Sequence, residues 1–274
     1  MLNISSLPSL ISPYILHTPW ISIRWYGVMY VLSIIVVYLV ATWRIKHEKC
    51  IITKEQFTDA LIWGFIGMVI GARLLYVFIY DPSYYLANPL QIIWPFEGSA
   101  YVGLAGFSYH GGLIGAILGL LLYCKKFRIR PWDMSDLIIP VIPIGYFFGR
   151  IGNFLNDELY GRVTSVPWGM YFPSDPTGKL RHPSQLYEAL LEGIVCFLIL
   201  WFVRKRIKGP QLFGLYLVTY AIARIIVEFF REPDPQLGFI FGALTMGQVL
   251  SGLMLCVGLG FVFFQRKISK KTIV

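Results

Sequence analysis

The sequence predicts an all-α integral membrane protein with seven transmembrane helices. Of its 274 residues, 56% are hydrophobic and 14% are charged, and the mean hydropathy is +0.63, which is too apolar for a soluble domain of this length. Crossing a bilayer takes about 20 mostly apolar residues. Segments of that kind lie near residues 25–43, 57–80, 104–124, 134–155, 185–203, 211–230 and 245–264. We therefore expect residues 1–274 to form a single multi-span membrane domain.

Lysines and arginines predict how these segments are oriented. They cluster after the first, third, fifth and seventh segments: Arg44, Lys46, Lys49, Lys54; Lys125, Lys126, Arg128, Arg130; Arg204, Lys205, Arg206, Lys208; Arg266, Lys267, Lys270, Lys271. All four clusters lie on one side of a seven-span chain, and the positive-inside rule makes that side the cytoplasm. The N-terminus is then outside and the C-terminus inside. Because this topology accounts for the net charge of +9, we expect no nucleic-acid partner.

Two loops on the opposite side are expected to form a small outer-face cap. Residues 156–183 contain turn residues and short β-branched or aromatic stretches, which favour a strand-and-turn structure. Residues 81–103 contain aromatic side chains typical of the lipid headgroup level. Pro140 and Pro143 predict a kink in the fourth segment. Glycines at four-residue spacing predict close helix packing in the second and third segments: Gly67, Gly71, Gly111, Gly115 and Gly119.

The most unusual stretch is 149–161, which carries Arg150, Asn153, Asn156 and Glu158 directly after an uncharged apolar run. An ionisable group reached through hydrocarbon is costly unless it faces protein or water, so these residues are expected to belong to a functional site. Snorkelling of an arginine from a helix end is the alternative. That alternative needs only one basic residue and leaves the asparagines and the glutamate unexplained.

A second group of charges approaches the outer side on the sixth segment. Arg224, Glu228 and Arg231 follow the spacing i, i+4 and i+7, so they share a helix face on which Glu228 can hold an arginine. Arg150 and Arg224 together suit a phosphate diester, because a guanidinium presents a planar fork to phosphate oxygens.

Other polar residues of the outer half allow two interpretations. Glu188 and Glu192 share a face of the fifth segment and Arg73 lies in the second, and each could either lock helices together or act in a site.

His110 is the only histidine within a predicted segment, and imidazole is well matched to proton transfer near neutral pH. We expect His110 to act as a base, with a structural histidine as the alternative and Tyr26 as another possible proton acceptor. The cysteines occur singly, without metal-ligand spacing.

These residues by themselves leave an enzyme and a transporter open. A transporter for an anionic solute would also place arginines in an intramembrane cavity, but it should show internal repeats with paired broken helices. The sequence has no such symmetry. A scaffolding membrane protein gives no reason for His110 and the arginines to gather.

The stretch Gly149 to Gly161 resembles the signature of the bacterial prolipoprotein diacylglyceryl transferase family. Read as G-R-x-G-N-F-x-N-x-E-x-x-G, it matches every fixed position, and a pattern this long is highly specific. Further stretches are similar to the family along the whole chain: Arg24-Trp25-Tyr26-Gly27, His110-Gly111-Gly112-Leu113, Arg181-His182-Pro183-Ser184-Gln185-Leu186-Tyr187-Glu188 and Glu228-Phe229-Phe230-Arg231-Glu232-Pro233-Asp234.

The resemblance implies a seven-span enzyme of the bacterial inner membrane with its active site in the outer half of the bilayer. It would transfer the diacylglyceryl group of phosphatidylglycerol to the lipobox cysteine thiol of a prolipoprotein, the first step of lipoprotein maturation, with release of glycerol-1-phosphate. The expected partners are these two substrates and membrane lipids, and no metal or diffusible cofactor is implied. The expected catalytic residues are His110, Tyr26, Arg150 and Arg224. The expected substrate-binding residues are Arg150, Asn153, Asn156, Glu158, Gly161, Arg224, Glu228 and Arg231.

Overall fold

The computed structural model describes residues 4–18, 20–94, 96–97, 100–101, 106–233, 239–240 and 244–271. The chain divides into two compact units. The larger unit comprises Met1–Glu48 and Ser135–Val274, and the smaller unit comprises Lys49–Met134. Each unit is described by itself below.

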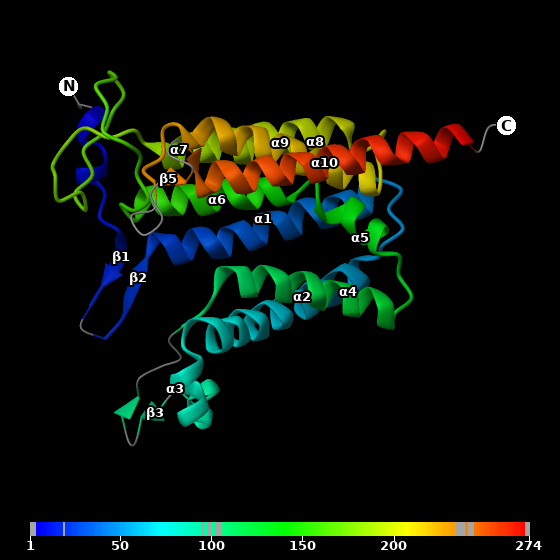
Figure 1. The fold of residues 1–274 in the computed structure, drawn as a ribbon, viewed down its shortest axis with the longest axis horizontal. Helices are drawn as coiled ribbons and strands as arrows, with labels where there is room; N and C mark the ends of the chain where they lie inside the picture. Colours follow the sequence, from blue (N-terminus) through cyan, green and yellow to red (C-terminus); the bar gives the residue numbers. More distant parts are fainter. Residues whose placement is uncertain are drawn as a thin grey trace. The chain divides into compact units, whose positions relative to one another are not determined.

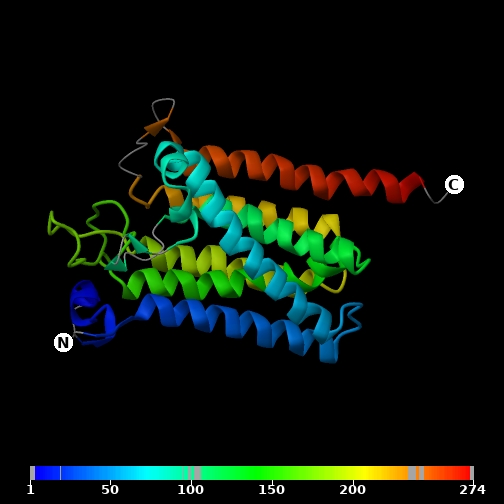
Figure 2. The same cartoon turned by 90° about the horizontal axis from the view of Figure 1, so that it is seen from below.

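Long helices packed side by side make up most of the larger unit (Figures 1 and 2). They are α1 (Trp25–His47), α6 (Ile142–Leu155), α9 (Pro210–Glu228) and α10 (Met246–Lys271). A further long helix, Ser184–Val203, consists of α7 (Ser184–Glu188), the π-helix η5 (Ala189–Val195) and α8 (Cys196–Val203) in direct succession. α1 packs on α6, α6 on η5, α9 on η5, and α10 on α9. Neighbours in this series run antiparallel, so the end of α6, the start of α7 and the end of α9 meet at one end of the unit (Figure 1).

The predicted kink in the fourth segment is confirmed. Helix α5 (Pro131–Ile138) and α6 are bent by 49° at a short break. Pro140 lies in that break and Pro143 in the first turn of α6, where the missing N–H groups cost no helical hydrogen bond. The chain therefore changes direction just before the helix that carries Arg150.

Short elements cover the end of the larger unit at which α6 and α9 finish. They are the 3₁₀ helices η1 (Ile4–Ser6) and η2 (Pro8–Leu10), the antiparallel hairpin β1 (Tyr14–His17) and β2 (Ser22–Arg24), and the short pair β5 (Phe239–Ile240) and β6 (Leu244–Thr245). Residues 156–183 form turns joined by isolated bridges from Val163 and Met170 to Arg181. The turns agree with the composition of this loop, which we call the cap; its place on the outer face of a membrane stays a prediction.

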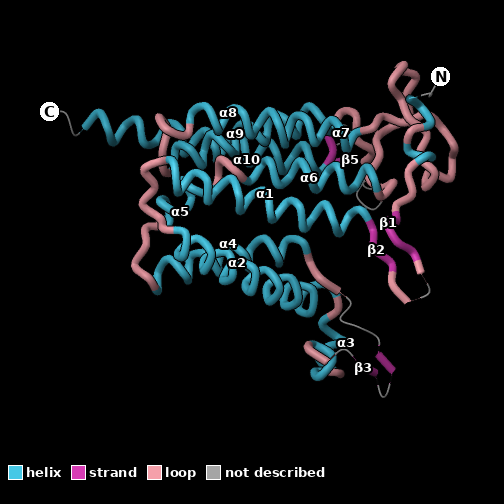
Figure 3. Tube along the Cα trace, turned by 180° about the vertical axis from the view of Figure 1, so that it is seen from behind, coloured by secondary structure: helices cyan, strands magenta, loops and turns pink. Residues whose placement is uncertain are grey.

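The smaller unit is built on α2 (Lys54–Leu75) and α4 (Tyr109–Lys126), which lie side by side (Figures 1 and 3). Between them come the π-helix η3 (Tyr76–Tyr80), α3 (Pro82–Ala87), the 3₁₀ helix η4 (Pro89–Ile92), β3 (Phe96–Glu97) and β4 (Ala100–Tyr101). The predicted glycine packing is confirmed. A Cβ on Gly67 would lie 2.2 Å from the carbonyl oxygen of Gly115, so only glycine allows the two backbones to come this close.

Helices long and apolar enough to span a membrane are confirmed, although fewer than the seven predicted meet the test of length and apolarity. Among the described residues, five helices pass, and the bent α5–α6 pair makes a sixth. Helix α4 is 18 residues long but begins with Tyr109-His110 and ends with Lys125-Lys126, which lowers its apolar content. Large apolar side chains on α1 are widely exposed, as with Ile34 at 59% and Leu39 at 58%, which is the surface expected of a helix that faces lipid.

Candidate active site

Glu188, in α7, is the centre of a buried ion-pair network in the larger unit. Its side chain is 0% exposed, and its Oε2 atom lies 2.8 Å from Nε of Arg150 and 3.2 Å from Nη1 of Arg224. Its other oxygen, Oε1, lies 3.7 Å from Nη1 of Arg231. Helices α6, α7 and α9 thus bring two arginines to the same carboxylate oxygen.

Two more glutamates complete the network around Arg224. Oε2 of Glu228 lies 3.0 Å from Nη2 of Arg224, which is the i, i+4 pair that the sequence predicts. Oε1 of Glu192 lies 3.7 Å from Nη1 of the same arginine. Glu228 also accepts a hydrogen bond of 2.9 Å from the hydroxyl of Thr245, just before α10. Since a buried carboxylate is stable only when paired, these contacts fix the rotamer of Arg224.

Tyr146 joins the network from α6, and our sequence reasoning missed it. Its hydroxyl donates to Oε2 of Glu188 at 3.2 Å and to Oε2 of Glu192. The guanidinium carbon of Arg150 lies 4.8 Å from the centre of its ring. Tyr146 precedes Arg150 by four residues, so helical spacing was the signal that could have identified it.

A chain of hydrogen bonds continues from Arg150 past the end of α6. Arg150 Nη1 donates to Asn153 Oδ1 at 3.0 Å, and Asn153 Nδ2 donates to Glu158 Oε1 at 2.7 Å. Asn156 Nδ2 donates to the other oxygen of Glu158 at 2.9 Å. The structure therefore joins Arg150, Asn153, Asn156 and Glu158 in one network.

Gln185 holds the turn that carries Glu158, and it is a second residue that our sequence reasoning passed over. Its Nε2 donates to the carbonyl oxygen of Glu158 at 2.7 Å, and its side chain is fully buried. On either side of Glu158, Asp157 and Leu159 have φ values of 58° and 59°, which are uncommon for residues other than glycine. Gln185 lies within one of the family-like stretches, so the signal was present in the sequence.

Gly161 lies where the cap meets the end of α9. It forms an isolated bridge with Arg231, and its N–H donates to the carbonyl oxygen of His182 at 2.8 Å. A Cβ at Gly161 would lie 2.3 Å from the carbonyl oxygen of Phe230. Arg162 extends this contact, because its Nε donates to the carbonyl oxygen of Arg231 at 2.8 Å. The glycine thus permits a close backbone approach that positions Arg231.

A separate ion pair stabilises the cap itself. Arg181 contacts Asp175 with Nε at 2.7 Å and Nη2 at 3.1 Å, and its Nη1 lies 3.1 Å from Glu232. The hydrogen bonds from Arg181 hold the pKa of the Asp175 carboxyl well below its usual range. Burial lowers the pKa of the neighbouring His182, because a charged imidazole is poorly solvated there.

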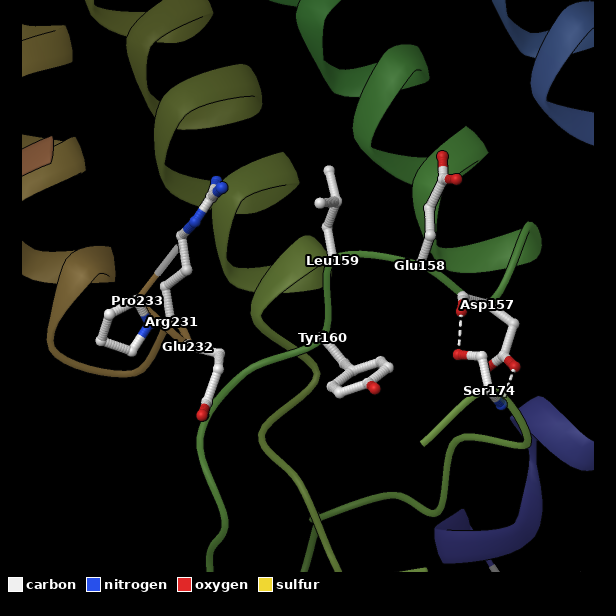
Figure 4. Close-up of a pocket in the computed structure, with 8 residues that line it drawn as sticks. All are labelled: Asp157, Glu158, Leu159, Tyr160, Ser174, Arg231, Glu232 and Pro233. Atoms are coloured by element: carbon white, nitrogen blue, oxygen red, sulfur yellow. Dashed lines mark hydrogen bonds between the residues drawn. The ribbon is translucent and has the colours of Figure 1, made fainter. Parts of the chain in front are cut away.

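A pocket of about 350 Å³ opens beside Glu158 and Arg231, at the edge of the ion-pair network around Glu188. It is lined by Asp157, Glu158, Leu159, Tyr160, Ser174, Arg231, Glu232 and Pro233. Figure 4 shows Arg231 and Glu158 extending toward the helices from opposite sides of the pocket, with Leu159 between them. Both charged side chains also belong to the set expected from the sequence.

Tyr26 and His110 lie at the starts of their helices. Tyr26 is the second residue of α1, and its Cα would lie 3.5 Å from a Cβ on Gly152 of α6, so it belongs to the larger unit beside the 149–161 stretch. His110 is the second residue of α4 in the smaller unit, where its side chain is exposed and its ring centre lies 5.7 Å from that of Tyr109.

The chemistry that the larger unit offers is binding of an anion by oriented arginines. The side chains of Arg150, Arg224 and Arg231 keep 18%, 13% and 14% of their surface exposed, whereas the glutamates that hold them are almost fully buried. A guanidinium that is fixed and only partly desolvated can bind phosphate oxygens without first reorganising. Among the described residues, no group of three or more His, Cys, Asp or Glu side chains could hold a metal ion.

Comparison with known proteins gives a consistent set of relatives. Residues 13–264 match the model of a family described as prolipoprotein diacylglyceryl transferase. A protein of Chlorobaculum tepidum named phosphatidylglycerol--prolipoprotein diacylglyceryl transferase is 47% identical over 266 residues, which cover 95% of this chain and 92% of that protein. Proteins of the same name from Aliarcobacter butzleri and Campylobacter lari are 47% and 45% identical, over 92% and 91% of this chain and 92% of each relative.

Proposed function

Because the chain belongs to the prolipoprotein diacylglyceryl transferase family, we propose that it transfers the diacylglyceryl group of phosphatidylglycerol to a prolipoprotein. The chain is a transferase, and this reaction is the first step of lipoprotein maturation. The observation that carries the proposal is that Arg150, which lies within the stretch that matches the family signature, and Arg224 contact the same buried carboxylate oxygen of Glu188.

We propose that the reaction is a displacement at carbon 3 of the lipid glycerol. The thiolate sulfur of the lipobox cysteine attacks this carbon, a thioether bond forms, and the carbon–oxygen bond to phosphate breaks. The electron pair of that bond remains on the phosphate oxygen, so glycerol-1-phosphate leaves. A free thiol has a pKa of about 8.5 and needs a base. His110 takes that proton in this proposal, with Tyr26 as the alternative acceptor.

Arg150 and Arg224 stabilise the leaving phosphate. Negative charge develops there as the bond breaks, so the arginines bind the transition state more strongly than the substrate. Glu188 and Tyr146 hold both guanidiniums in place beforehand, which removes the cost of ordering them during the reaction.

The remaining residues position the lipid headgroup or these arginines. Asn153, Asn156 and Glu158 form the hydrogen-bonded chain that starts at Arg150. Glu228 orients Arg224. Arg231 lines the pocket with Glu158, and the backbone bridge from Gly161 supports it.

We also propose the full membrane topology, from the family to which the chain belongs and from the positions of the basic residues. Residues 1–274 form one membrane domain of seven spans, in which α4 is the span that falls short of the strict test. In the larger unit, α1, α8 and α10 all end on the side opposite the cap (Figure 1). Basic residues lie near the end of each of these helices or directly after it, so the positive-inside rule assigns that side to the cytoplasm. The site then lies in the outer half of the bacterial inner membrane, where phosphatidylglycerol and the lipobox of a prolipoprotein meet.

The test is transfer of diacylglycerol from phosphatidylglycerol to a lipobox peptide by purified protein in detergent. Arg150→Lys keeps the charge and loses the planar fork, and we expect kcat to fall by about 100-fold to 1000-fold. Arg130→Lys is the matched control, because Arg130 is 75% exposed in a surface ion pair with Asp133 and should keep its rate within twofold. His110→Gln removes the proposed base and should lower kcat by about 100-fold or more.

Two results would overturn the proposal. Normal transfer by Arg150→Lys would contradict phosphate recognition by a guanidinium. No transfer by the wild-type protein, together with uptake of an anionic solute into vesicles that contain it, would favour a transporter.

A further inference from the structure

Arg73 is a buried arginine of the smaller unit whose guanidinium donates to three backbone carbonyls. It lies in the last turn of α2 and is 8% exposed. Its Nε donates to the carbonyl oxygen of Ile92 at 2.8 Å, Nη2 to that of Gln91 at 2.7 Å and Nη1 to that of Gly106 at 3.0 Å. All three acceptors lie between α2 and α4, so one side chain joins the middle of this connection to the residues just before α4.

Gly106, the third of these acceptors, lies three residues before the start of α4. Two residues later, Ser108 N–H donates to the carbonyl oxygen of Ala72 at 2.9 Å, and the Ser108 hydroxyl caps the helix by accepting from Gly111 N–H at 3.3 Å. Consecutive residues of α2, Ala72 and Arg73, therefore fix the residues that lead into α4. The first turn of α4 is tied to α2 at this point.

Close backbone packing makes this attachment rigid. A Cβ on Gly111 would lie 2.3 Å from the carbonyl oxygen of Gly71, and a Cβ on Gly71 would lie 2.4 Å from that of Gly111. With so little space between the helices, a shift of the residues before α4 must be taken up by its first turn. His110 precedes Gly111 in that turn.

We infer that Arg73 is a positioning residue that sets the location of the His110 imidazole. The inference rests on the proposed role of His110 as the base. Arginine suits this task because its N–H groups point in fixed directions within one plane, which allows the carbonyls of η4 and of Gly106 to be bound at once. A lysine ammonium is a flexible point charge and cannot reproduce that geometry.

The experiment compares two conservative variants that remove the same kind of support. Arg73→Lys is the test. Arg44→Lys is the matched control, because Arg44 is 1% exposed and also makes three hydrogen bonds, to Glu48 at 3.0 Å and to the carbonyls of Asp136 at 3.0 Å and Leu137 at 2.7 Å. Both full-length variants are assayed with phosphatidylglycerol and a lipobox peptide, and kcat and KM are determined separately.

We expect Arg73→Lys to lower kcat by about 100-fold, the loss that a displacement of about 1 Å produces, with KM for phosphatidylglycerol changed less than about twofold. Arg44→Lys should lower kcat less than about twofold. The decisive readout is the double variant: in a His110→Gln background, Arg73→Lys should reduce the residual rate less than about twofold, because its effect acts through the imidazole.

Equal losses of kcat in Arg73→Lys and Arg44→Lys would overturn the inference, as would a 100-fold effect of Arg73→Lys that persists without His110. A different variant tests the proposed role of His110 on which the inference rests. A His110→Gln single variant with wild-type turnover would show that His110 is not the base, whatever the Arg73 variants do.

Discussion

Replacing Gly161 with alanine should destabilise the junction between the cap and the end of α9. The new Cβ would lie 2.3 Å from the Phe230 carbonyl oxygen and 2.9 Å from Cβ of His182. Ordinary contact needs about 3.5 Å, so the backbone must move by about 1 Å. The Phe230 carbonyl cannot move alone, because it accepts a hydrogen bond of 2.8 Å from the N–H of Arg162.

The expected cost follows from these contacts. Overpacking of this kind costs about 1–3 kcal/mol, and weakening one backbone hydrogen bond adds about 1 kcal/mol. Gly149→Ala is the matched control from the same signature stretch. A Cβ at Gly149 has no heavy atom within 4 Å, and alanine is favoured over glycine inside a helix by about 1 kcal/mol.

Thermal unfolding of the detergent-purified variants measures the difference. In a chain of this size each kcal/mol corresponds to about 2–4 °C in Tm, so Gly161→Ala should melt at least about 4 °C below wild type. Gly149→Ala should melt at or above the wild-type temperature. If both variants melt within about 1 °C of each other, the close approach at Gly161 does not constrain the fold and the reasoning is wrong.

Three further substitutions test the ion-pair networks by the same measurement. Glu188→Gln leaves two arginines without their shared charge and should cost about 3–5 kcal/mol; a wild-type Tm would show that other carboxylates hold the arginines. Tyr146→Phe keeps the ring but removes the hydroxyl donor to Glu188, so it should cost about 1–3 kcal/mol, and a larger loss than that of Glu188→Gln would contradict this order. Arg181 depresses the pKa of Asp175, so the stability that this pair contributes is present above the unfolded pKa of about 3.9 and is lost as the pH falls further. The Tm difference between wild type and Asp175→Asn should therefore be largest near neutral pH and decrease below about pH 4, and a constant difference would refute the assignment.

Several features were predictable because they depend on residues close together in the chain. The Arg224–Glu228 pair follows from i, i+4 spacing, the kink before α6 from Pro140 and Pro143, and the α2–α4 contact from glycines at four-residue intervals. The 149–161 stretch likewise identified its own polar network, since its members lie within one turn of helix and the following loop. For Arg73, the sequence left structure and function equally open, and the hydrogen bonds to Gln91, Ile92 and Gly106 give it a structural task.

The sequence by itself determined the apolar helices and the family, because runs of apolar residues and a long signature are both local properties. Tertiary structure alone decided which distant residues contact the buried carboxylate of Glu188. Glu188 is 36 residues from Arg224 and 42 from Tyr146, and nothing in the chain between them specifies that their side chains meet. That choice depends on how α6, α7 and α9 pack, since a buried carboxylate takes whichever donors the neighbouring helices bring within hydrogen-bonding distance.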